Sequence, residues 1–330
     1  MLRSSLVVFA LLVSLAAASA SASQRAYVSA ISGDDANIAT GCVVTAPCRW
    51  FTGAISAVDP GGELVVLDSG AYGTVTITKS ISIISAPGVY AGISVFSGDG
   101  ITIATPGIHV VLRGLNINRI GGSGNGINMT AGNSLVVQNC VITNFSVGSG
   151  LLVSSDSLVR VLDSLLRGNN FGARFWAGKS VLVSGSRLLE NAMHGISFEA
   201  SGSPIGAVIS RSEASGNGSV GFYAQASIGW QVRLNVKDSV ATRNGSGVFV
   251  HSGAGTILAS VSNSLMSENT NYGLGAQSEG AKLVASGNKV THNGTGLAQT
   301  YDSVLQSTGD NTVSDNTTAF TGTITTINKM

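Results

Sequence analysis

Charged residues are scarce in this chain, because Asp, Glu, Lys and Arg together make up only 11% of its 330 residues. An ordinary globular domain has about 25%. The formal net charge is +1, and Lys and Arg do not cluster anywhere in the sequence. Because a protein needs a basic face to neutralise phosphates, this composition argues against nucleic acid as a partner.

Cysteine is also rare, with three residues in total. Cys42 and Cys48 lie at the two ends of the segment CVVTAPC, and an exported protein could keep this pair as a disulfide. A zinc site built from Cys alone needs about four ligands. Three cysteines therefore do not indicate a metal centre, and we expect neither a metal nor another cofactor.

Long apolar runs are missing outside the N-terminus. There, Arg3 precedes an apolar stretch from Leu6 to Ala18, and small residues follow with Ala-x-Ala patterns that end at Ala20 or Ala22. This order predicts a signal peptide over residues 1–22. A membrane anchor is the weaker alternative, because the run is shorter than the ~20 residues that cross a bilayer. We expect a protein without a membrane span that is secreted, periplasmic or on the cell surface.

A repeating unit occupies the chain from about residue 110 onward. Each unit contains an apolar pair, a small polar residue, an Asn, a Gly and a second short apolar run. The Asn column consists of Asn118, Asn144, Asn169, Asn191, Asn217, Asn244, Asn269, Asn293 and Asn316. The Gly column consists of Gly126, Gly150, Gly172, Gly195, Gly221, Gly247, Gly273 and Gly296. Two columns with a shared period of about 25 residues are typical of a solenoid.

Short strands are the elements that we predict within each unit. Segments such as ISFEA and VFVHS alternate over three to five positions, which favours strands. Neither a leucine-rich consensus nor a helical period of 3.6 residues occurs between the columns. Gly suits tight corners, and stacked Asn side chains can hydrogen-bond to the backbone and to each other. The sequence therefore predicts an all-β solenoid in which each coil contacts its neighbours.

These columns resemble the right-handed parallel β-helix of the pectin-lyase-like superfamily, in which an Asn ladder follows one corner. Residues 26–73 are similar to the N-terminal cap of exported members. The resemblance implies a strand at Tyr27 and Val28, a loop fixed by Cys42 and Cys48, and a short helix over about residues 49–58 that covers the open end. Strand edges at the end of a solenoid need such a cover.

The resemblance also sets the expected organisation of the chain. Residues 23–60 would form the cap, and residues 61–330 would form a β-helix of roughly ten coils. The last segment, residues 318–330, is rich in Thr and Ile, and an exposed edge there could support an oligomer.

A third column consists of Cys140, Ser164, Ser186, Ser212, Ser239, Ser264, Asn288 and Asn311. Cys140 thus replaces a small stacked residue, and no His shares its column. Since a nucleophilic thiol needs a partnering base, we expect Cys140 to be buried filler.

Six Asn residues begin N-x-S/T sequences: Asn128, Asn144, Asn217, Asn244, Asn293 and Asn316. The last five belong to the Asn column and are expected to face inward. Glycosylation is therefore the weaker interpretation for those five.

The positions after each column glycine predict which side chains face outward. The first and third positions are apolar in nearly every coil, so the second and fourth face solvent. In four consecutive coils the outward positions carry large side chains, which we call the strip: Arg174, Trp176, Glu199, Tyr223, Gln225, Phe249 and His251. With coils about 4.8 Å apart, the strip would be ~15 Å tall, about the reach of three or four sugar rings.

A polysaccharide or cell-surface glycan is the partner that the strip best fits. Aromatic rings stack on sugars, and an Arg can bind a carboxylate with two hydrogen bonds, which favours an anionic chain. The predicted binding residues are Arg174, Trp176, Tyr223, Gln225 and Phe249. The alternative is structural, because large β-forming residues also suit an exposed strand face, and Arg174 with Glu199 could be a surface ion pair of little value.

The strip also contains candidates for catalysis, although the sequence leaves open whether the protein is an enzyme. Glu199 could act as acid or base, Tyr223 or His251 could transfer protons, and Arg174 could stabilise charge. Glycoside hydrolysis usually needs two carboxylates about 5–9.5 Å apart, and Glu199 is the only acidic residue of the strip. A polysaccharide lyase or epimerase is therefore favoured over a hydrolase. The catalytic motifs of the superfamily are not matched, so no catalytic residue follows from the resemblance.

The rival interpretation is a non-catalytic surface solenoid, such as an adhesin or a spacer, which needs no aromatic face. His109, His194 and His292 lie in different columns, and we expect them in solvent or in turns. Asp34 and Asp35 are expected to serve a turn.

Overall fold

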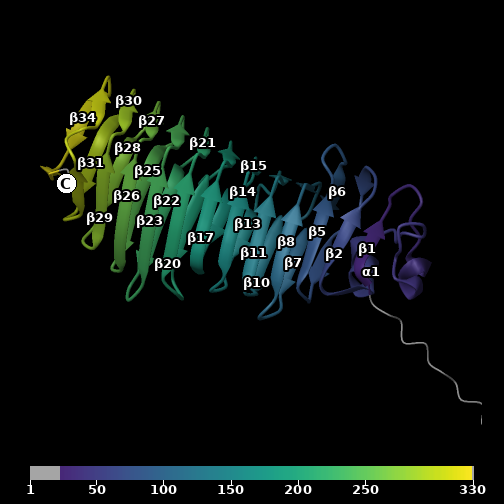
Figure 1. The fold of residues 1–330 in the computed structure, drawn as a ribbon. Helices are drawn as coiled ribbons and strands as arrows, with labels where there is room; N and C mark the ends of the chain where they lie inside the picture. The colour runs from purple at the N-terminus through teal and green to yellow at the C-terminus, as the bar shows by residue number, and fades with distance from the viewer. Residues whose placement is uncertain (1–22, 329–330) are drawn as a thin grey trace, which may run out of the picture.

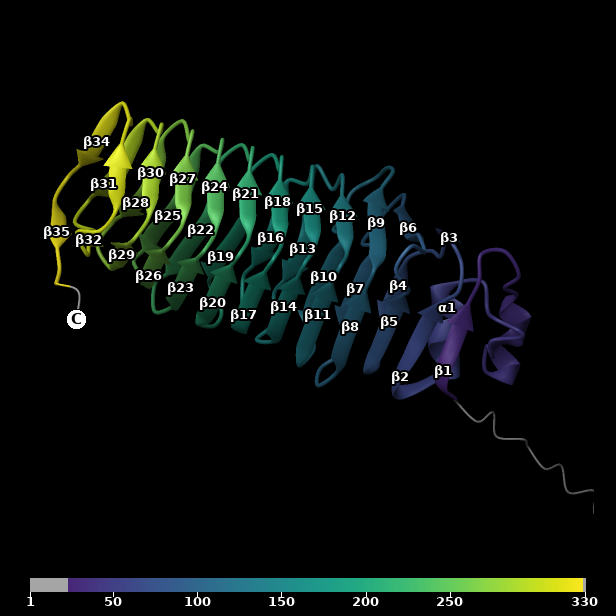
Figure 2. The same cartoon turned by 45° about the horizontal axis from the view of Figure 1, so that its top comes forward.

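The protein is an elongated stack of coils. The computed structural model describes residues 23–328, in which 35 strands form three long sheets. The cap lies at one end of the stack and the last strands lie at the other (Figures 1 and 2). The predicted signal peptide, residues 1–22, lies outside the described residues. No helix within residues 23–328 is long and apolar enough to cross a membrane.

Each sheet takes one strand from each coil. Sheet A consists of β1 (Ser23–Val28), β2 (Val58–Val66), β5 (Ile81–Ser85), β8 (His109–Arg113), β11 (Ser134–Gln138), β14 (Leu158–Leu162), β17 (Gly178–Ser184), β20 (Ile205–Ser210), β23 (Gln231–Lys237), β26 (Thr256–Ser262), β29 (Ala281–Ser286), β32 (Val304–Ser307) and β35 (Ile324–Thr326). Sheet B consists of β3 (Gly70–Ala71), β6 (Ala91–Val95), β9 (Leu115–Arg119), β12 (Val141–Thr143), β15 (Leu165–Arg167), β18 (Arg187–Leu189), β21 (Glu213–Ser215), β24 (Val240–Thr242), β27 (Leu265–Ser267), β30 (Lys289–Thr291) and β33 (Thr312–Ser314). Sheet C consists of β4 (Val75–Ile77), β7 (Ile101–Ala104), β10 (Ile127–Ala131), β13 (Ser149–Val153), β16 (Phe171–Phe175), β19 (Ile196–Ala200), β22 (Val220–Ser227), β25 (Ser246–Gly253), β28 (Tyr272–Gln277), β31 (Thr295–Thr300) and β34 (Thr318–Thr321).

The chain visits sheets C, A and B in turn, and neighbouring strands in each sheet pair in parallel (Figure 2). Val136, for example, pairs with Val111 in the preceding coil and with Arg160 in the following coil. This arrangement confirms the predicted parallel solenoid of roughly ten coils.

The core fills the space between the three sheets. Along β11, buried and partly exposed residues alternate, as the period-two pattern predicts. The inward positions of sheet C are also apolar and buried, including Ile127, Met129, Phe175 and Phe198. The Phe175 and Phe198 rings stack at 5.3 Å on consecutive coils.

The Asn ladder lies at the corner between sheets B and C, and it is shorter than predicted. In each regular coil the Asn Oδ1 accepts hydrogen bonds from the backbone and side-chain amides of the preceding Asn, as Asn217 does from Asn191 at 3.0 and 2.9 Å. The ladder consists of Asn169, Asn191, Asn217, Asn244, Asn269, Asn293 and Asn316.

The assignment of Asn118 and Asn144 to this ladder is wrong. Asn169 Oδ1 accepts a hydrogen bond from the backbone N–H of Phe145. The buried Phe145 therefore occupies the ladder position in that coil. Asn144 lies one residue earlier, with φ of 70° and an exposed side chain. Asn118 is aligned with Thr143 of the next coil, which lies two residues before the ladder position at Phe145. The expectation of an inward side chain therefore holds for the buried Asn217, Asn244 and Asn293 but not for Asn144.

The Gly column packs directly beside the ladder. A Cβ on Gly221 would lie 2.8 Å from the carbonyl oxygen of Gly247 and 3.1 Å from Asn244 Nδ2. Gly195 has the same surroundings one coil earlier. Close approach of consecutive coils, rather than a left-handed backbone conformation, therefore explains why these positions are glycine.

The third column forms a second ladder at the corner between sheets A and B. The Ser164 backbone N–H donates to Ser186 Oγ at 3.2 Å, and Ser186 donates in the same way to Ser212. Cys140 begins this ladder by donating its N–H to Ser164 Oγ at 3.1 Å. Its thiol is buried, and burial raises its pKa to about 11, which fits a role as filler.

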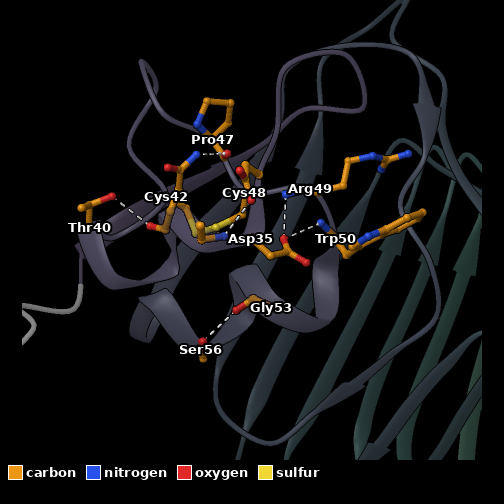
Figure 3. The surroundings of a disulfide bond; sticks show 12 residues. Asp35, Thr40, Cys42, Pro47, Cys48, Arg49, Trp50, Gly53 and Ser56 are labelled. Atoms are coloured by element: carbon orange, nitrogen blue, oxygen red, sulfur yellow. Dashed lines mark hydrogen bonds between the residues drawn. A yellow bond between two sulfur atoms is a disulfide. The ribbon is translucent and has the colours of Figure 1, made fainter.

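The cap covers the first coil with short helical segments, which are η1 (Asp35–Thr40), α1 (Phe51–Ala54) and η2 (Ile55–Ala57). The predicted helix is therefore present, although α1 itself has only four residues. Phe51 is buried and its ring stacks on Tyr72 at 5.3 Å. Cys42 and Cys48 form the predicted disulfide (Figure 3). The oligomer predicted at the last strands stays a prediction.

Candidate functional site

The strip lies on the outer face of sheet C, as the alternation predicts. Arg174, Ser197, Tyr223 and Phe249 are aligned across β16, β19, β22 and β25. Two residues further along, a polar row aligns Glu199, Gln225, His251 and Gln277. Trp176 directly follows β16. Consecutive coils thus bring all seven predicted residues to one surface.

Arg174 is held on three sides by other residues. Its Nε and Nη2 donate to the two carboxylate oxygens of Glu199 at 3.0 and 2.6 Å. Its guanidinium also lies over the rings of Phe171, at 4.4 Å, and Trp176, at 5.0 Å, which are cation–π distances. Trp176 is nevertheless exposed, so one aromatic surface of the strip is accessible.

This ion pair is more sheltered than a typical surface pair. The side chains of Arg174 and Glu199 are 28% and 17% exposed, whereas both partners of the Arg167–Glu190 pair on sheet B are more than half exposed. A sheltered bidentate pair is screened less by water and salt. Arg174 and Glu199 therefore form a fixed unit that neutralises its own charge.

An aromatic stack continues from this pair along the molecule. His194 stacks on Tyr223 at 4.5 Å, Tyr223 on Phe249 at 6.5 Å, and Phe249 on Tyr272 at 5.7 Å. Phe171 contacts His194 from the other side at 5.5 Å. Because neighbouring rings face each other, the faces of Tyr223 and Phe249 pack against one another and are not both available to stack on a sugar.

The expectation that His194 lies in solvent or in a turn is wrong. It is 9% exposed, and its Nδ1 accepts the Val220 backbone N–H at 3.2 Å. Burial lowers its pKa to about 4; the Arg174 charge lowers it further, and only the smaller effect of Glu199 opposes this shift. The imidazole is therefore neutral at pH 7, and the bond to Nδ1 assigns its proton to Nε2.

Tyr223 is a hydrogen-bond donor rather than a base at neutral pH. Burial, with a smaller effect of Glu199, raises the pKa of its phenol to about 12. The hydroxyl donates to Gln225 Oε1 at 3.1 Å. The two residues thus fix each other beside the polar row.

Three side chains of this site were not predicted: Phe171, His194 and Tyr272. Each directly precedes a glycine of the Gly column, at Gly172, Gly195 and Gly273. A recurrent aromatic residue or His at this position was the available signal.

The contacts of Glu199 constrain the acid–base chemistry of the strip. Both oxygens of Glu199 accept hydrogen bonds from Arg174, so Glu199 could exchange a proton with a substrate only after the ion pair breaks. The strip holds no second carboxylate for a hydrolytic pair. Within residues 23–328, no group of three His, Cys, Asp or Glu side chains is placed to hold a metal ion.

The comparison with known proteins agrees with this architecture. Residues 91–260 match the family model described as "Right handed beta helix region". The chain belongs to this family. Its fold is the right-handed parallel β-helix that the sequence predicts.

Two solved structures are similar to this β-helix protein. A crystal structure of pectate lyase Pel9A is 16% identical, with a TM-score of 0.57 over 92% of this chain and 77% of that chain. Endopolygalacturonase I from Stereum purpureum, complexed with two galacturonates, is 13% identical, with a TM-score of 0.39 over 80% of this chain and 95% of that chain. At these identities the likeness concerns the fold alone. No curated protein sequence is a significant match.

Proposed function

We propose that this β-helix protein is exported and binds an anionic polysaccharide along the strip on sheet C. The observation that carries the proposal is the uneven distribution of aromatic residues. Within residues 23–328, the strands of sheet B contain no Phe, Trp or Tyr, and those of sheet A contain only Tyr27. A rigid spacer has no need for such a one-sided arrangement.

The polar row supports a glycan as the ligand. Glu199, Gln225, His251 and Gln277 lie side by side and can bond sugar hydroxyls. Trp176 offers an exposed ring next to them. Arg174 uses Nε and Nη2 for Glu199, which leaves Nη1 to bind a substrate carboxylate.

Export is supported by the chemistry of the cap. The Cys42–Cys48 disulfide persists in oxidising compartments such as the periplasm and the extracellular space. We keep residues 1–22 as the proposed signal peptide, residues 23–60 as the cap and residues 61–330 as the β-helix.

The superfamily includes lyases and epimerases, and we retain such a reaction at Glu199, Tyr223, His251 and Arg174 as the second candidate function. The proton-donating Tyr223 beside the polar row is what favours it, and Glu199 would take part once its pair with Arg174 breaks.

Binding is tested by titrating residues 23–330 calorimetrically with oligogalacturonate, oligoalginate and neutral oligosaccharides. We expect acidic oligosaccharides to bind, and Trp176→Ala to weaken that binding at least tenfold. The matched control is Arg160→Ala, which removes an exposed cation from the outer face of sheet A. Equal losses in both variants, or no binding by the unaltered protein, would overturn the proposal.

Cleavage is tested separately by measuring new reducing ends. We expect none to be released from acidic or neutral polysaccharides. Release that the Glu199→Gln variant loses would instead establish the second candidate, with its centre beside Trp176.

A further inference from the structure

A groove lies between the cap and the first coils, at the corner between sheets B and C. Its larger part, of about 340 Å³, is lined by Trp50, Ala71, Gly73, Thr74, Ser94, Phe96 and Ser97. A neighbouring hollow of about 260 Å³ shares Thr74 and is lined by Thr52, Val75, Thr76, Asp99 and Thr102. We call the two together the cap groove.

Trp50 is the principal aromatic residue of the cap groove, and its position is fixed. Asp35 Oδ1 accepts the backbone N–H groups of Arg49 and Trp50 at 2.8 and 3.1 Å (Figure 3). The Arg49 guanidinium lies 3.9 Å from the Trp50 ring centroid, and its Nη1 donates to the Ala71 carbonyl at 2.8 Å. Asp35 therefore does more than serve the predicted turn, whereas Asp34 does cap η1.

The Arg49 guanidinium covers one face of the fixed indole, and part of the side chain remains open to a ligand. Trp50 is 42% exposed, and its side chain points away from the disulfide loop (Figure 3). It lies against Gly73, where a Cβ would come within 3.4 Å of the ring. Phe96, also in the lining, is 67% exposed. Two solvent-exposed rings in one groove, one of them fixed, are typical of a recognition site.

The remaining lining selects for an uncharged ligand with many hydroxyls. Thr52, Thr74, Thr76, Thr102, Ser94 and Ser97 supply hydroxyl groups. The neighbouring cation, Arg49, is engaged by the Trp50 ring and by the Ala71 carbonyl. Asp99 adds a carboxylate, which the Asn125 N–H and Asn128 Nδ2 hold at 2.7 Å each. A fixed negative charge repels uronate carboxylates and accepts hydrogen bonds from sugar hydroxyls.

We propose that the cap groove is a second glycan-binding site, specific for neutral hexopyranose chains, with a sugar ring packed on Trp50 and flanked by Phe96. The site is separate from the strip. Thr76, Thr102, Asn128, Leu152 and Arg174 follow one another across consecutive strands of sheet C. Four steps of about 4.8 Å place Arg174 ~19 Å from Thr76 along the molecule.

The test uses residues 23–330 and calorimetric titration with hexasaccharides of β-1,4-linked glucose, mannose or xylose, the last as a pentose comparison. We expect at least one neutral hexose chain to bind, and Trp50→Ala and Phe96→Ala each to weaken it at least tenfold. The matched control is Trp176→Ala, which we expect to leave this affinity within twofold. Phe96→Ala guards against a folding defect, because its exposed ring contributes little to the core, and thermal unfolding verifies both variants.

Several results would overturn this inference. The first is that neutral hexose chains do not bind at millimolar concentration. The others are an unchanged affinity in Phe96→Ala and a loss of neutral-chain binding in Trp176→Ala. Failure of the proposed function at the strip is distinguishable, because it concerns acidic chains and Trp176 rather than neutral chains and Trp50.

Discussion

Replacing one ladder asparagine measures how much this corner stabilises the solenoid. Asn217 Oδ1 accepts from the Asn191 backbone N–H at 3.0 Å and from Asn191 Nδ2 at 2.9 Å. Asn217 Nδ2 donates to the Leu188 carbonyl at 3.0 Å and to Asn244 Oδ1 at 2.9 Å. Asn217→Ala removes all four bonds and takes the acceptor from a buried N–H, because Asn191 is 1% exposed.

The expected cost follows from these contacts. A hydrogen bond contributes about 0.5–1.5 kcal/mol net, and a buried donor left without a partner costs about 1–3 kcal/mol. Because the four bonds share partners and are not additive, we expect Asn217→Ala to lower the free energy of unfolding by about 3–5 kcal/mol. Urea unfolding followed by far-UV circular dichroism measures this change.

Asn118→Ala is the matched control. Asn118 Oδ1 accepts only from side chains in this structure, Thr143 Oγ1 at 3.2 Å and Asn144 Nδ2 at 2.7 Å, and we expect a loss below about 1 kcal/mol. If the two variants lost the same stability, the reasoning that the ladder acts by satisfying buried backbone groups would be refuted.

Three further predictions concern the strip and its neighbouring corner. Because burial lowers the pKa of folded His194 to about 4, against 6.5 for an imidazole in water, the unfolded chain binds more protons between these pH values. Stability should therefore fall as the pH drops from 6.5 to 4, and thermal unfolding of His194→Gln should show a flatter pH profile. Ser197 Oγ is buried and makes no hydrogen bond within residues 23–328, so Ser197→Ala should leave the unfolding free energy unchanged or raise it by up to about 1 kcal/mol, and a clear loss would show that the hydroxyl has a partner. Gly221→Ala should cost about 1–3 kcal/mol by overpacking, whereas Gly202→Ala, with no atom within 4 Å of the added Cβ, should be nearly neutral in the same urea titration.

Most of the fold follows from local sequence patterns. The alternation in segments such as ISFEA gives both the strand and its inward face, since Phe198 is buried and Glu199 is not. The Gly column gives the alignment of consecutive coils correctly, because steric contact between coils leaves no room for a Cβ at Gly195 or Gly221.

Residue identity and spacing are not sufficient to predict which Asn residues belong to the ladder. Asn144 and Asn169 look equivalent, but Asn144 occupies the left-handed turn position, with φ of 70°, and the next residue, Phe145, turns inward. Which residue takes the turn depends on backbone conformation. A one-residue shift of this kind leaves the average repeat spacing almost unchanged, so the spacing cannot reveal it.

The strip was predicted as a set of positions but not as a set of contacts. Alternation places Arg174 and Glu199 on one face, yet it does not determine that they bond to each other with two hydrogen bonds. The expectation for His194 is wrong because it rests on the absence of a shared column with the other histidines, which says nothing of packing between coils. The contact of His194 with Tyr223 depends on packing between coils, which a single coil does not specify.

The equivalence of the ladder bonds makes a coil an exchangeable unit of length. Asn191, Asn217, Asn244 and Asn269 present the same donors and acceptors to the coil on either side. A deletion of residues 245–269 would remove β25, β26 and β27 together and leave Asn244 facing Asn293 across an unchanged corner. Duplication or loss of one whole coil therefore preserves both ends of the molecule, so such changes in gene length need no redesign of the cap, and they alter only how many side chains the strip displays.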